Sequence, residues 1–252
     1  MKRLKIIICL LLCLCCGKLT AQEYAGIAGM VHVPTAEMAS AGEARIGAYF
    51  LNWHSLPEQI GKNEYHTFNH FLALTPFSWL ELSYVCTLLK RNKDADFNMK
   101  DRSFSAKVRP LKEGKWWPSV AVGMQDIGHS PSNDAGADAA YFQNIFLALT
   151  KHLHWKRHEF GIHLAYRYYT SDYNAKWRGI AGGVSYRPAF ARNLRAMVEY
   201  TGSNVNIGVD CQLWRHLFLQ ASLLDGKYPS GGVSFKINLL GGNKQWKEHL
   251  PQ

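Results

Sequence analysis

The chain has 252 residues, a formal net charge of +10 and an aromatic fraction of 13%. The basic excess is modest and its lysines and arginines are not clustered, which argues against a nucleic-acid partner. The six cysteines do not form a disulfide framework, because four of them lie within the first 16 residues and only Cys86 and Cys211 follow.

Residues 1–21 have the pattern of a secretory signal peptide. A basic start precedes an apolar run, from Ile6 to Cys16, that is too short to span a membrane. The small residue Ala21 predicts cleavage near this position. A buried core helix and a lipoprotein signal are the alternatives, but no cysteine here follows the small residue that lipid attachment needs. The segment therefore predicts export, with a formal charge of +6 on the remaining chain because four of the 29 lysines and arginines leave with it.

Two segments flank the main part of the exported chain. Residues 22–42 are rich in small residues and irregular, which predicts an N-terminal periplasmic lead-in or a plug against a barrel opening. Residues 241–252 form a polar C-terminal tail. Neither segment has the pattern of a long helix or a regular strand.

Between these segments, apolar and polar residues alternate with a period of two, which is typical of strands whose faces meet different surroundings. The clearest case is Phe160, Ile162 and Leu164 against Gly161 and His163. One segment, Tyr65–Thr75, has an ambiguous phase. The predicted strands are Glu43–Phe50, Tyr65–Thr75, Leu80–Leu88, Asp101–Arg109, Val120–Gln125, Tyr141–Thr150, Phe160–Tyr169, Ile180–Arg187, Leu194–Tyr200, Val205–Gln212, Leu217–Leu223 and Val233–Leu239.

This pattern predicts an all-β fold, an antiparallel up-and-down transmembrane β-barrel of about twelve strands over residues 43–240. Segments of about ten residues are long enough to cross a bilayer at a tilt. A soluble sandwich or a lipocalin-like barrel is the alternative. The second face of nearly every strand is polar or charged, which an apolar soluble core would not accept. We therefore expect a bacterial outer-membrane protein.

The connections between the predicted strands alternate in character. Every second connection belongs to a set that holds five of the eight tryptophans, whereas the others are mostly rich in Asn, Asp, Ser and Gly and tend to be longer. Tryptophans favour the interface between membrane and water, so we expect one girdle on the periplasmic side. Ordinary packing aromatics are the alternative. The candidate interface residues are Trp79, Trp116, Trp117, Trp155 and Trp214.

Charged residues on the polar faces are candidates for lining the lumen. Seven cations against three anions would bias a water-filled interior towards anionic solutes. The alternative is an interior filled by interlocked charge pairs that carries nothing through. The candidate lumen-lining residues are Arg45, Glu81, Lys107, Arg109, Arg167, Arg187, Arg195, Glu199, Asp210 and Lys236.

The sequence offers little for catalysis, and we expect no enzyme, no cofactor and no metal site. The eleven histidines show no metal-ligand spacing, and there is no phosphate-binding loop or redox pair. His163 and Ser185 share the inward parity on successive strands, which leaves a hydrolase dyad acting on lipid or glycan as the alternative. Cys86 and Cys211 take the outward parity, where they behave as small apolar residues.

Two stretches resemble a known family, the YjbH-type outer-membrane proteins linked to exopolysaccharide biosynthesis and export. The first is Asp101-Arg102-Ser103-Phe104, followed by Lys107, Glu113, Pro118, Ala121-Val122-Gly123 and Asp126. The second, upstream, is Gly29, Pro34-Thr35-Ala36, Met38, Gly42 and Arg45-Ile46-Gly47. Members of this family are often much longer, whereas this chain has room for one barrel.

The resemblance implies a barrel that assists exopolysaccharide secretion or surface assembly, either as a pore with a polar, mildly basic lumen or as a docking surface. Its expected partners are outer-membrane lipid, an anionic polysaccharide and other proteins of the export machinery. The competing prediction is a structural or adhesive barrel whose extracellular loops, Lys90–Lys100 and Ile127–Ala140, bind a partner.

Overall fold

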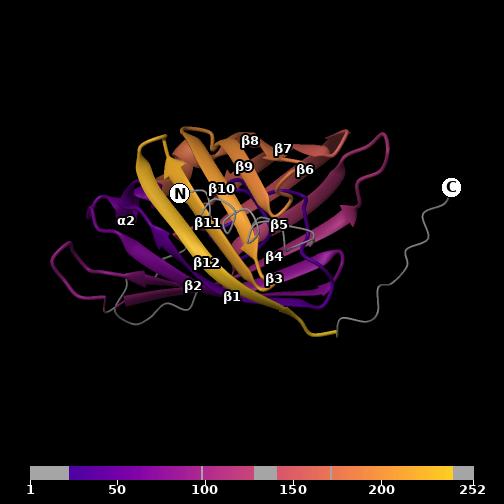
Figure 1. Ribbon diagram of the computed structural model, residues 1–252. Helices are drawn as coiled ribbons and strands as arrows, with labels where there is room; N and C mark the ends of the chain where they lie inside the picture. The colour runs from indigo at the N-terminus through magenta and orange to yellow at the C-terminus, as the bar shows by residue number, and fades with distance from the viewer. Residues whose placement is uncertain (1–22, 98, 128–140, 171, 241–252) are drawn as a thin grey trace, which may run out of the picture.

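Each alternating segment forms a strand that pairs with its neighbour in the chain, and the twelve strands close into an antiparallel barrel (Figure 1). The computed structural model describes residues 23–97, 99–127, 141–170 and 172–240. The predicted signal peptide, most of the predicted loop Ile127–Ala140 and the tail 241–252 lie outside the described residues. The strands are β1 (Glu43–Leu51), β2 (Thr67–Phe77), β3 (Leu80–Leu89), β4 (Met99–Leu111), β5 (Ser119–Ile127), β6 (Asn144–Trp155), β7 (His158–Tyr169), β8 (Gly179–Arg187), β9 (Leu194–Tyr200), β10 (Val205–Leu213), β11 (Leu217–Leu224) and β12 (Tyr228–Asn238).

The barrel closes where β12 pairs with β1, from Glu43 opposite Asn238 to Phe50 opposite Gly231. The two ends of the barrel differ. The connections that follow the even-numbered strands, the start of β1 and the end of β12 lie at one end, which we call the turn end. The other connections, which include the longest, lie at the opposite end, the loop end, with the 3₁₀ turns η1 (Trp53–Ser55) and η2 (Asp172–Trp177) and the short helix α2 (Glu58–Gly61). No helix in the described ranges is long and apolar enough to cross a membrane.

The strand parity separates an apolar outer face from a polar inner face. On β7, Ile162, Leu164 and Tyr166 are 49%, 48% and 53% exposed, whereas Ala165 and Arg167 are buried. The same alternation recurs around the barrel. The wall therefore presents large apolar side chains outwards, the pattern of a strand whose outer side meets lipid.

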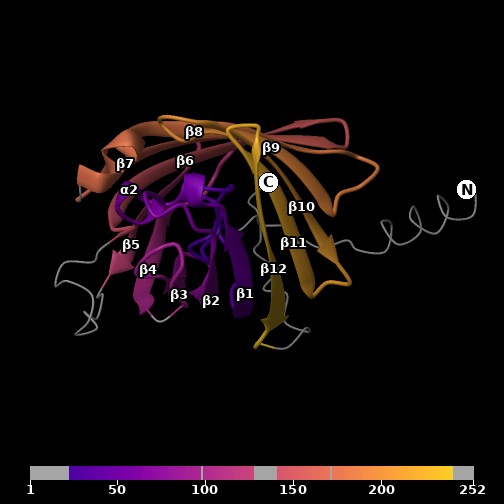
Figure 2. The same cartoon turned by 90° about the vertical axis from the view of Figure 1, so that its left-hand side faces the viewer.

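Residues 23–41, called the plug below, lie inside the barrel (Figure 2). The plug doubles back on itself, with the Met30 N–H donating to the Val33 carbonyl at 2.9 Å. Its apolar side chains fit against inward glycines of the wall: a Cβ added at Gly183 would lie 2.8 Å from the side chain of Met30, and one at Gly208 would lie 2.8 Å from that of Val31. The hydrophobic core thus lies between plug and wall.

The plug also decides the phase of β2, which the sequence left ambiguous. Phe71 points inwards and is 2% exposed, whereas Leu72 points outwards and is 46% exposed. Room for the Phe71 ring comes from two glycines, Gly26 in the plug and Gly47 on β1, where an added Cβ would lie 3.0 Å and 2.4 Å from the ring.

Candidate functional site

One interior carboxylate gathers three successive main-chain donors of the plug. Glu199 on β9 accepts the N–H groups of Val31, His32 and Val33 at 3.0, 2.9 and 3.1 Å, and the Asn206 side chain also donates to it at 2.8 Å. A buried carboxylate of this kind is stable because its lone pairs are hydrogen-bonded. Glu199 therefore fixes the main chain of the plug at His32.

A second anchor is the ion pair between Glu81 on β3 and Lys107 on β4, at 2.9 Å. Glu81 accepts the main-chain N–H groups of Ala28 and Ala39. The Lys107 ammonium donates to the carbonyls of Ala28 and Glu37 at 2.7 and 2.6 Å. Both charges thus hold the plug through its main chain.

Arg195 on β9 joins wall and plug by side-chain charges. It is fully buried and lies 2.9 Å from both Asp210 on β10 and Glu37 of the plug, and it also donates to the Gly29 carbonyl at 3.2 Å. Burial alone would raise the pKa of Glu37, but the charge of Arg195 and a hydrogen bond from His152 hold that pKa well below its usual range. Glu37 is therefore a buried, ionised carboxylate.

Arg167 on β7 completes the anchors at the loop end. Its guanidinium donates to the His32 carbonyl at 3.0 Å and to the carbonyl of Thr201. Two more predicted residues lie inside near the turn end: Arg45 pairs with Glu43, and Lys236 lies 3.9 Å from the same carboxylate. The predicted lumen residues that lie inside are thus paired with each other, with Glu43 or with the plug.

Arg109 and Arg187 lie at the turn end instead of the middle of the lumen. Arg109 is half-buried and donates to the Ser78 carbonyl at 2.8 Å. It lies in the stretch between Val108 and Leu111 where the register between β4 and β5 shifts. Arg187 pairs with Glu159 and lies 3.8 Å from Glu37.

The five predicted interface tryptophans all lie at or next to connections of the turn end. Trp116 is the most open of them, at 81%, and Trp155 follows at 65%. Trp117 donates its indole N–H to the Lys112 carbonyl at 3.2 Å. Trp79 and Trp214 complete the set, and Trp214 has a positive φ of 48° in the turn between β10 and β11.

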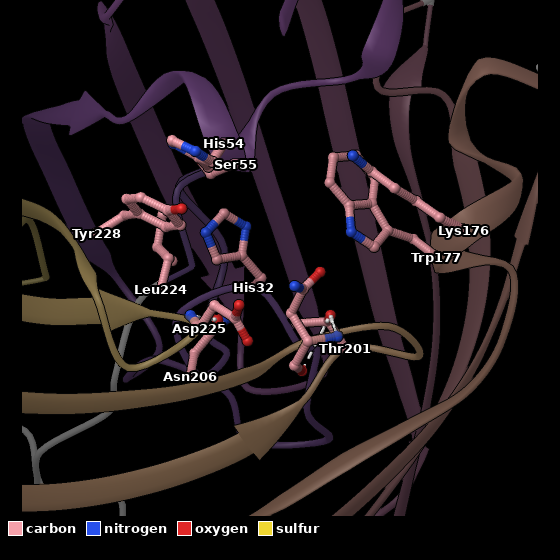
Figure 3. A pocket seen from close by; sticks show the side chains of 11 residues that line it. His32, His54, Ser55, Lys176, Trp177, Thr201, Asn206, Leu224, Asp225 and Tyr228 are labelled. Atoms are coloured by element: carbon pink, nitrogen blue, oxygen red, sulfur yellow. Dashed lines mark hydrogen bonds between the residues drawn. The ribbon is translucent and has the colours of Figure 1, made fainter.

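A pocket of about 350 Å³ opens at the loop end (Figure 3). The plug supplies its floor through His32, and four separate connections supply its walls. The lining residues are His32, His54, Ser55, Lys176, Trp177, Thr201, Asn204, Asn206, Leu224, Asp225 and Tyr228. We call this the loop-end pocket.

Local contacts fix the walls of the loop-end pocket. The His54 ring stacks on the Tyr228 ring, with centroids 3.4 Å apart and planes 12° apart. Asp225 has a positive φ of 52° in an Asp-Gly turn, a conformation that this dipeptide favours, and its main-chain N–H donates to Asn206 at 3.0 Å. Across the pocket, the Lys176 ammonium lies 4.7 Å from the Trp177 ring centre.

The loop-end pocket carries little net charge. Burial lowers the pKa of His32 to about 3, and the nearby Arg167 lowers it further. Burial, followed by the neighbouring His66, also lowers the pKa of His54. Both rings are therefore neutral at neutral pH. Lys176 and Asp225 remain as one cation and one anion.

A second cavity, of about 640 Å³, lies at the turn end under the plug residues 36–41. Its lining is basic: Arg109, Lys112, Lys115 and Lys151 face Glu37, Glu113 and Glu159. Although burial alone would raise the pKa of Glu113, hydrogen bonds from His152, at 2.8 Å from its main chain and 2.7 Å from its ring, lower that pKa. The plug separates this turn-end cavity from the loop-end pocket.

His163 and Ser185 form the hydrogen bond that their parity allowed, at 3.0 Å. The other ring nitrogen of His163 lies 3.1 Å from the Thr150 hydroxyl, which in turn accepts the Ala36 N–H of the plug at 3.0 Å. A hydrolytic triad has a carboxylate or an amide in the place of this threonine. Both members of the pair are buried beneath the plug.

Clustered metal ligands and disulfides are absent from the described part of the chain. No group of three His, Cys, Asp or Glu side chains there could hold a metal ion. Cys86 and Cys211 form no disulfide.

Sequence reasoning did not single out the loop-end pocket. Its residues come from the plug and from connections that share no period, so only the fold brings them together. Two local signals were present: the Asp225-Gly226 dipeptide, and the tryptophan in the loop connection before Gly179, which stands apart from the turn-end tryptophans.

Comparison with known proteins gives a family match over most of the chain. The model of the YjbH family, described as exopolysaccharide biosynthesis protein YbjH, matches residues 21–176. An uncharacterized lipoprotein YjbH from Escherichia coli strain K12 is 30% identical over 121 residues, which is 45% of this chain and 15% of that protein. The chain therefore spans a small part of the length of this relative.

Solved structures give weaker likenesses. The dimeric outer-membrane phospholipase of Salmonella typhi with bound calcium is 12% identical, with a TM-score of 0.36 over 79% of this chain and 91% of that chain. Outer-membrane phospholipase A from Escherichia coli is also 12% identical, with a TM-score of 0.34 over 78% of this chain and 95% of that chain.

Proposed function

The chain belongs to the YjbH family, and from that membership we propose that it is an outer-membrane barrel that assists the secretion or surface assembly of an exopolysaccharide. The apolar outer wall supports the membrane part of this proposal. Side chains such as Ile162, Leu164 and Tyr168 are about half exposed along one strand, where water contact would be unfavourable. The exposed tryptophans of the turn end suit the periplasmic interface.

The plug is the observation that favours docking over conduction. It occupies the lumen, and the anchors from Glu81, Lys107, Arg195 and Glu199 hold it by main-chain and side-chain contacts. A pore with a polar, mildly basic lumen would require these contacts to break. We therefore propose that polymer contacts the two ends of the barrel, while Glu81, Lys107, Arg195 and Glu199 hold the plug.

The two ends suit different partners. The turn-end cavity, with Arg109, Lys112, Lys115 and Lys151 at its lining, has the cations that would meet an anionic stretch of polysaccharide entering from the periplasm. Other proteins of the export machinery would approach the same end. The loop end would face out of the cell.

We also propose that the protein has no hydrolytic activity. The His163–Ser185 pair is buried under the plug, and a threonine stands where a triad needs an orienting acid or amide. The test is Ser185→Ala assayed on phospholipid and on polysaccharide. The variant should behave as the unaltered protein, and an activity that Ser185→Ala or His163→Ala abolishes would overturn this proposal.

The function is tested by deleting the gene in its host and measuring exopolysaccharide at the cell surface and inside the envelope. Loss of the protein should lower the surface polymer while polymer inside the envelope persists, and a plasmid copy should restore the surface level. Unchanged surface polymer together with reduced adhesion would instead favour the adhesive barrel, whose loop Lys90–Lys100 lies at the loop end.

A further inference from the structure

The loop-end pocket offers hydrogen-bonding groups that the fold itself does not use. The His32 ring, the Asp225 carboxylate, the Tyr228 hydroxyl, the Trp177 indole N–H and the Lys176 ammonium make no hydrogen bond to any residue that the structure describes. The ammonium and the indole N–H are donors, the carboxylate is an acceptor, and the hydroxyl and the imidazole can donate and accept. A ligand with several hydroxyls would satisfy them together, because each hydroxyl both donates and accepts.

Aromatic rings stand on both sides of these groups. In Figure 3, the Tyr228 ring lies on one side of His32 and the Trp177 ring on the other. The His54 ring, which also lines the pocket, stacks on the Tyr228 ring. A pyranose ring carries C–H groups on its faces, and the electron-rich face of an aromatic ring attracts such polarised C–H groups. The pocket thus combines aromatic rings, which can contact the C–H faces of a sugar, with polar groups that can bind its hydroxyls.

We propose that the loop-end pocket binds one uncharged sugar residue of the exopolysaccharide. That the sugar belongs to the exopolysaccharide rests on the proposed function. That the ligand is a neutral sugar rests on the pocket alone. Its volume of about 350 Å³ is at the small end of ligand sites, which suits one ring of a chain that continues outside.

The charges of the pocket favour a neutral sugar over an acidic sugar or a phosphate. Lys176 and Asp225 balance each other, and both histidines are neutral at neutral pH. An acidic ligand would meet the Asp225 carboxylate, whereas the basic lining lies at the opposite, turn end of the barrel. The two cavities therefore separate neutral from acidic recognition.

The pocket is also held in place before any ligand arrives. Glu199 fixes the main chain at His32, and Asn206 fixes the main chain at Asp225. The Asn206 side chain donates to Glu199 as well, so one buried network positions the floor and the acidic wall together. Preorganisation lowers the entropy cost of binding.

The test is isothermal titration of the detergent-purified whole protein. The probes are neutral trisaccharides of glucose, galactose or mannose, a glucuronate-containing trisaccharide, and inorganic phosphate. At least one neutral trisaccharide should bind more tightly than the acidic one and phosphate. Tyr228→Ala should weaken that binding about tenfold, and Tyr228→Phe, which keeps the ring, less. Asp225→Asn, which tolerates the same positive φ, should weaken it about tenfold or more.

The matched control is Asp172→Asn, since Asp172 lies at the same end outside the pocket and its side chain is 97% exposed. It should leave binding unchanged. Absence of neutral-sugar binding, tighter binding of glucuronate or phosphate, or equal binding by Asp225→Asn and Asp172→Asn would overturn the inference.

If gene deletion lowers surface polymer but plasmid copies carrying Asp225→Asn or Tyr228→Ala restore it fully, the pocket inference fails while the proposed function stands. If deletion has no effect, the proposed function fails, and titration still decides what the pocket binds.

Discussion

Glu199 on the barrel wall accepts the main-chain N–H of His32 at 2.9 Å, and the ring of His32 forms the floor of the loop-end pocket. One interior carboxylate thus connects the sealing of the lumen with the shape of the site above it. A change at Glu199 should therefore affect stability, conductance and sugar binding together.

Glu199→Ala should lower the free energy of unfolding by about 3 kcal/mol or more. The N–H groups of Val31, His32 and Val33 would lose their acceptor, and each such loss at the two buried groups, those of Val31 and Val33, costs about 1–3 kcal/mol. Urea unfolding in detergent micelles measures the change. The control is Glu64→Ala, whose exposed pair with Lys93 should contribute less than about 1 kcal/mol. Equal effects of the two variants would contradict the anchoring role.

Arg195→Ala should cost about 3–5 kcal/mol, because it leaves Asp210 and Glu37 as buried carboxylates without their cation. Arg178→Ala is the control, since the carboxylate that Arg178 pairs with, Asp172, is almost fully exposed, and the other hydrogen bond of Arg178 goes to the Tyr169 carbonyl. The same unfolding experiment compares them. A loss at Arg195 no larger than at Arg178 would mean that the plug is not held by this guanidinium.

Glu23 should make the stability depend on pH with a defined sign. Burial raises the pKa of Glu23 to about 8 in the folded protein, although a hydrogen bond from Gln125 opposes the shift. The folded state therefore holds a proton that the unfolded state releases above the usual carboxylate range. The contribution of this proton to the free energy of unfolding is fully present below the usual carboxylate pKa. It is lost as pH rises to about 8, and the free energy of unfolding then falls by up to about 1.4 kcal/mol per pH unit.

The measurement is thermal unfolding between pH 5 and pH 9 for the unaltered protein and for Glu23→Gln. The melting temperature of the unaltered protein should fall relative to that of the variant as pH rises through this range. A constant difference across the range, or a rise, would contradict a protonated Glu23 inside the barrel.

An arginine on the outer face of the barrel should destabilise the folded protein strongly only if that face contacts lipid. Ile162→Arg places a cation on the apolar face of β7, which should cost about 2–4 kcal/mol at the middle of a bilayer. Phe190→Arg, in an exposed turn between β8 and β9, is the control. Folding into liposomes measures both. A wall surrounded by water would accept Arg at either position within about 0.5 kcal/mol.

The fold could be predicted because its signal is local. Alternation along single strands, such as Phe160 to Tyr169, requires no knowledge of what the strand pairs with. The phase of β2 could not be predicted, since Phe71 is accommodated by Gly26 of the plug and Gly47 of β1, both distant in the sequence. The barrel pattern was therefore visible, and a plug was one of two alternatives predicted for residues 22–42, but the contacts between plug and wall were not visible.

The candidate site shows the same limit. Parity alone points Lys107, Arg195 and Glu199 inwards, but their partners are main-chain groups of a segment without any period. A net count of interior charges therefore suggested a basic lumen, whereas the plug engages those charges. The loop-end pocket depends on five separate pieces of chain, and no spacing within the sequence connects His32 to Tyr228.

We propose that the N-terminal segment of this barrel seals its lumen and that polymer meets the barrel at its ends. The most direct measurement is single-channel conductance of the purified protein in planar bilayers, with insertion verified by liposome flotation. The unaltered protein should insert without a steady current, and Glu199→Ala should show openings as the plug loosens. A steady current through the unaltered protein that added exopolysaccharide blocks would contradict the claim.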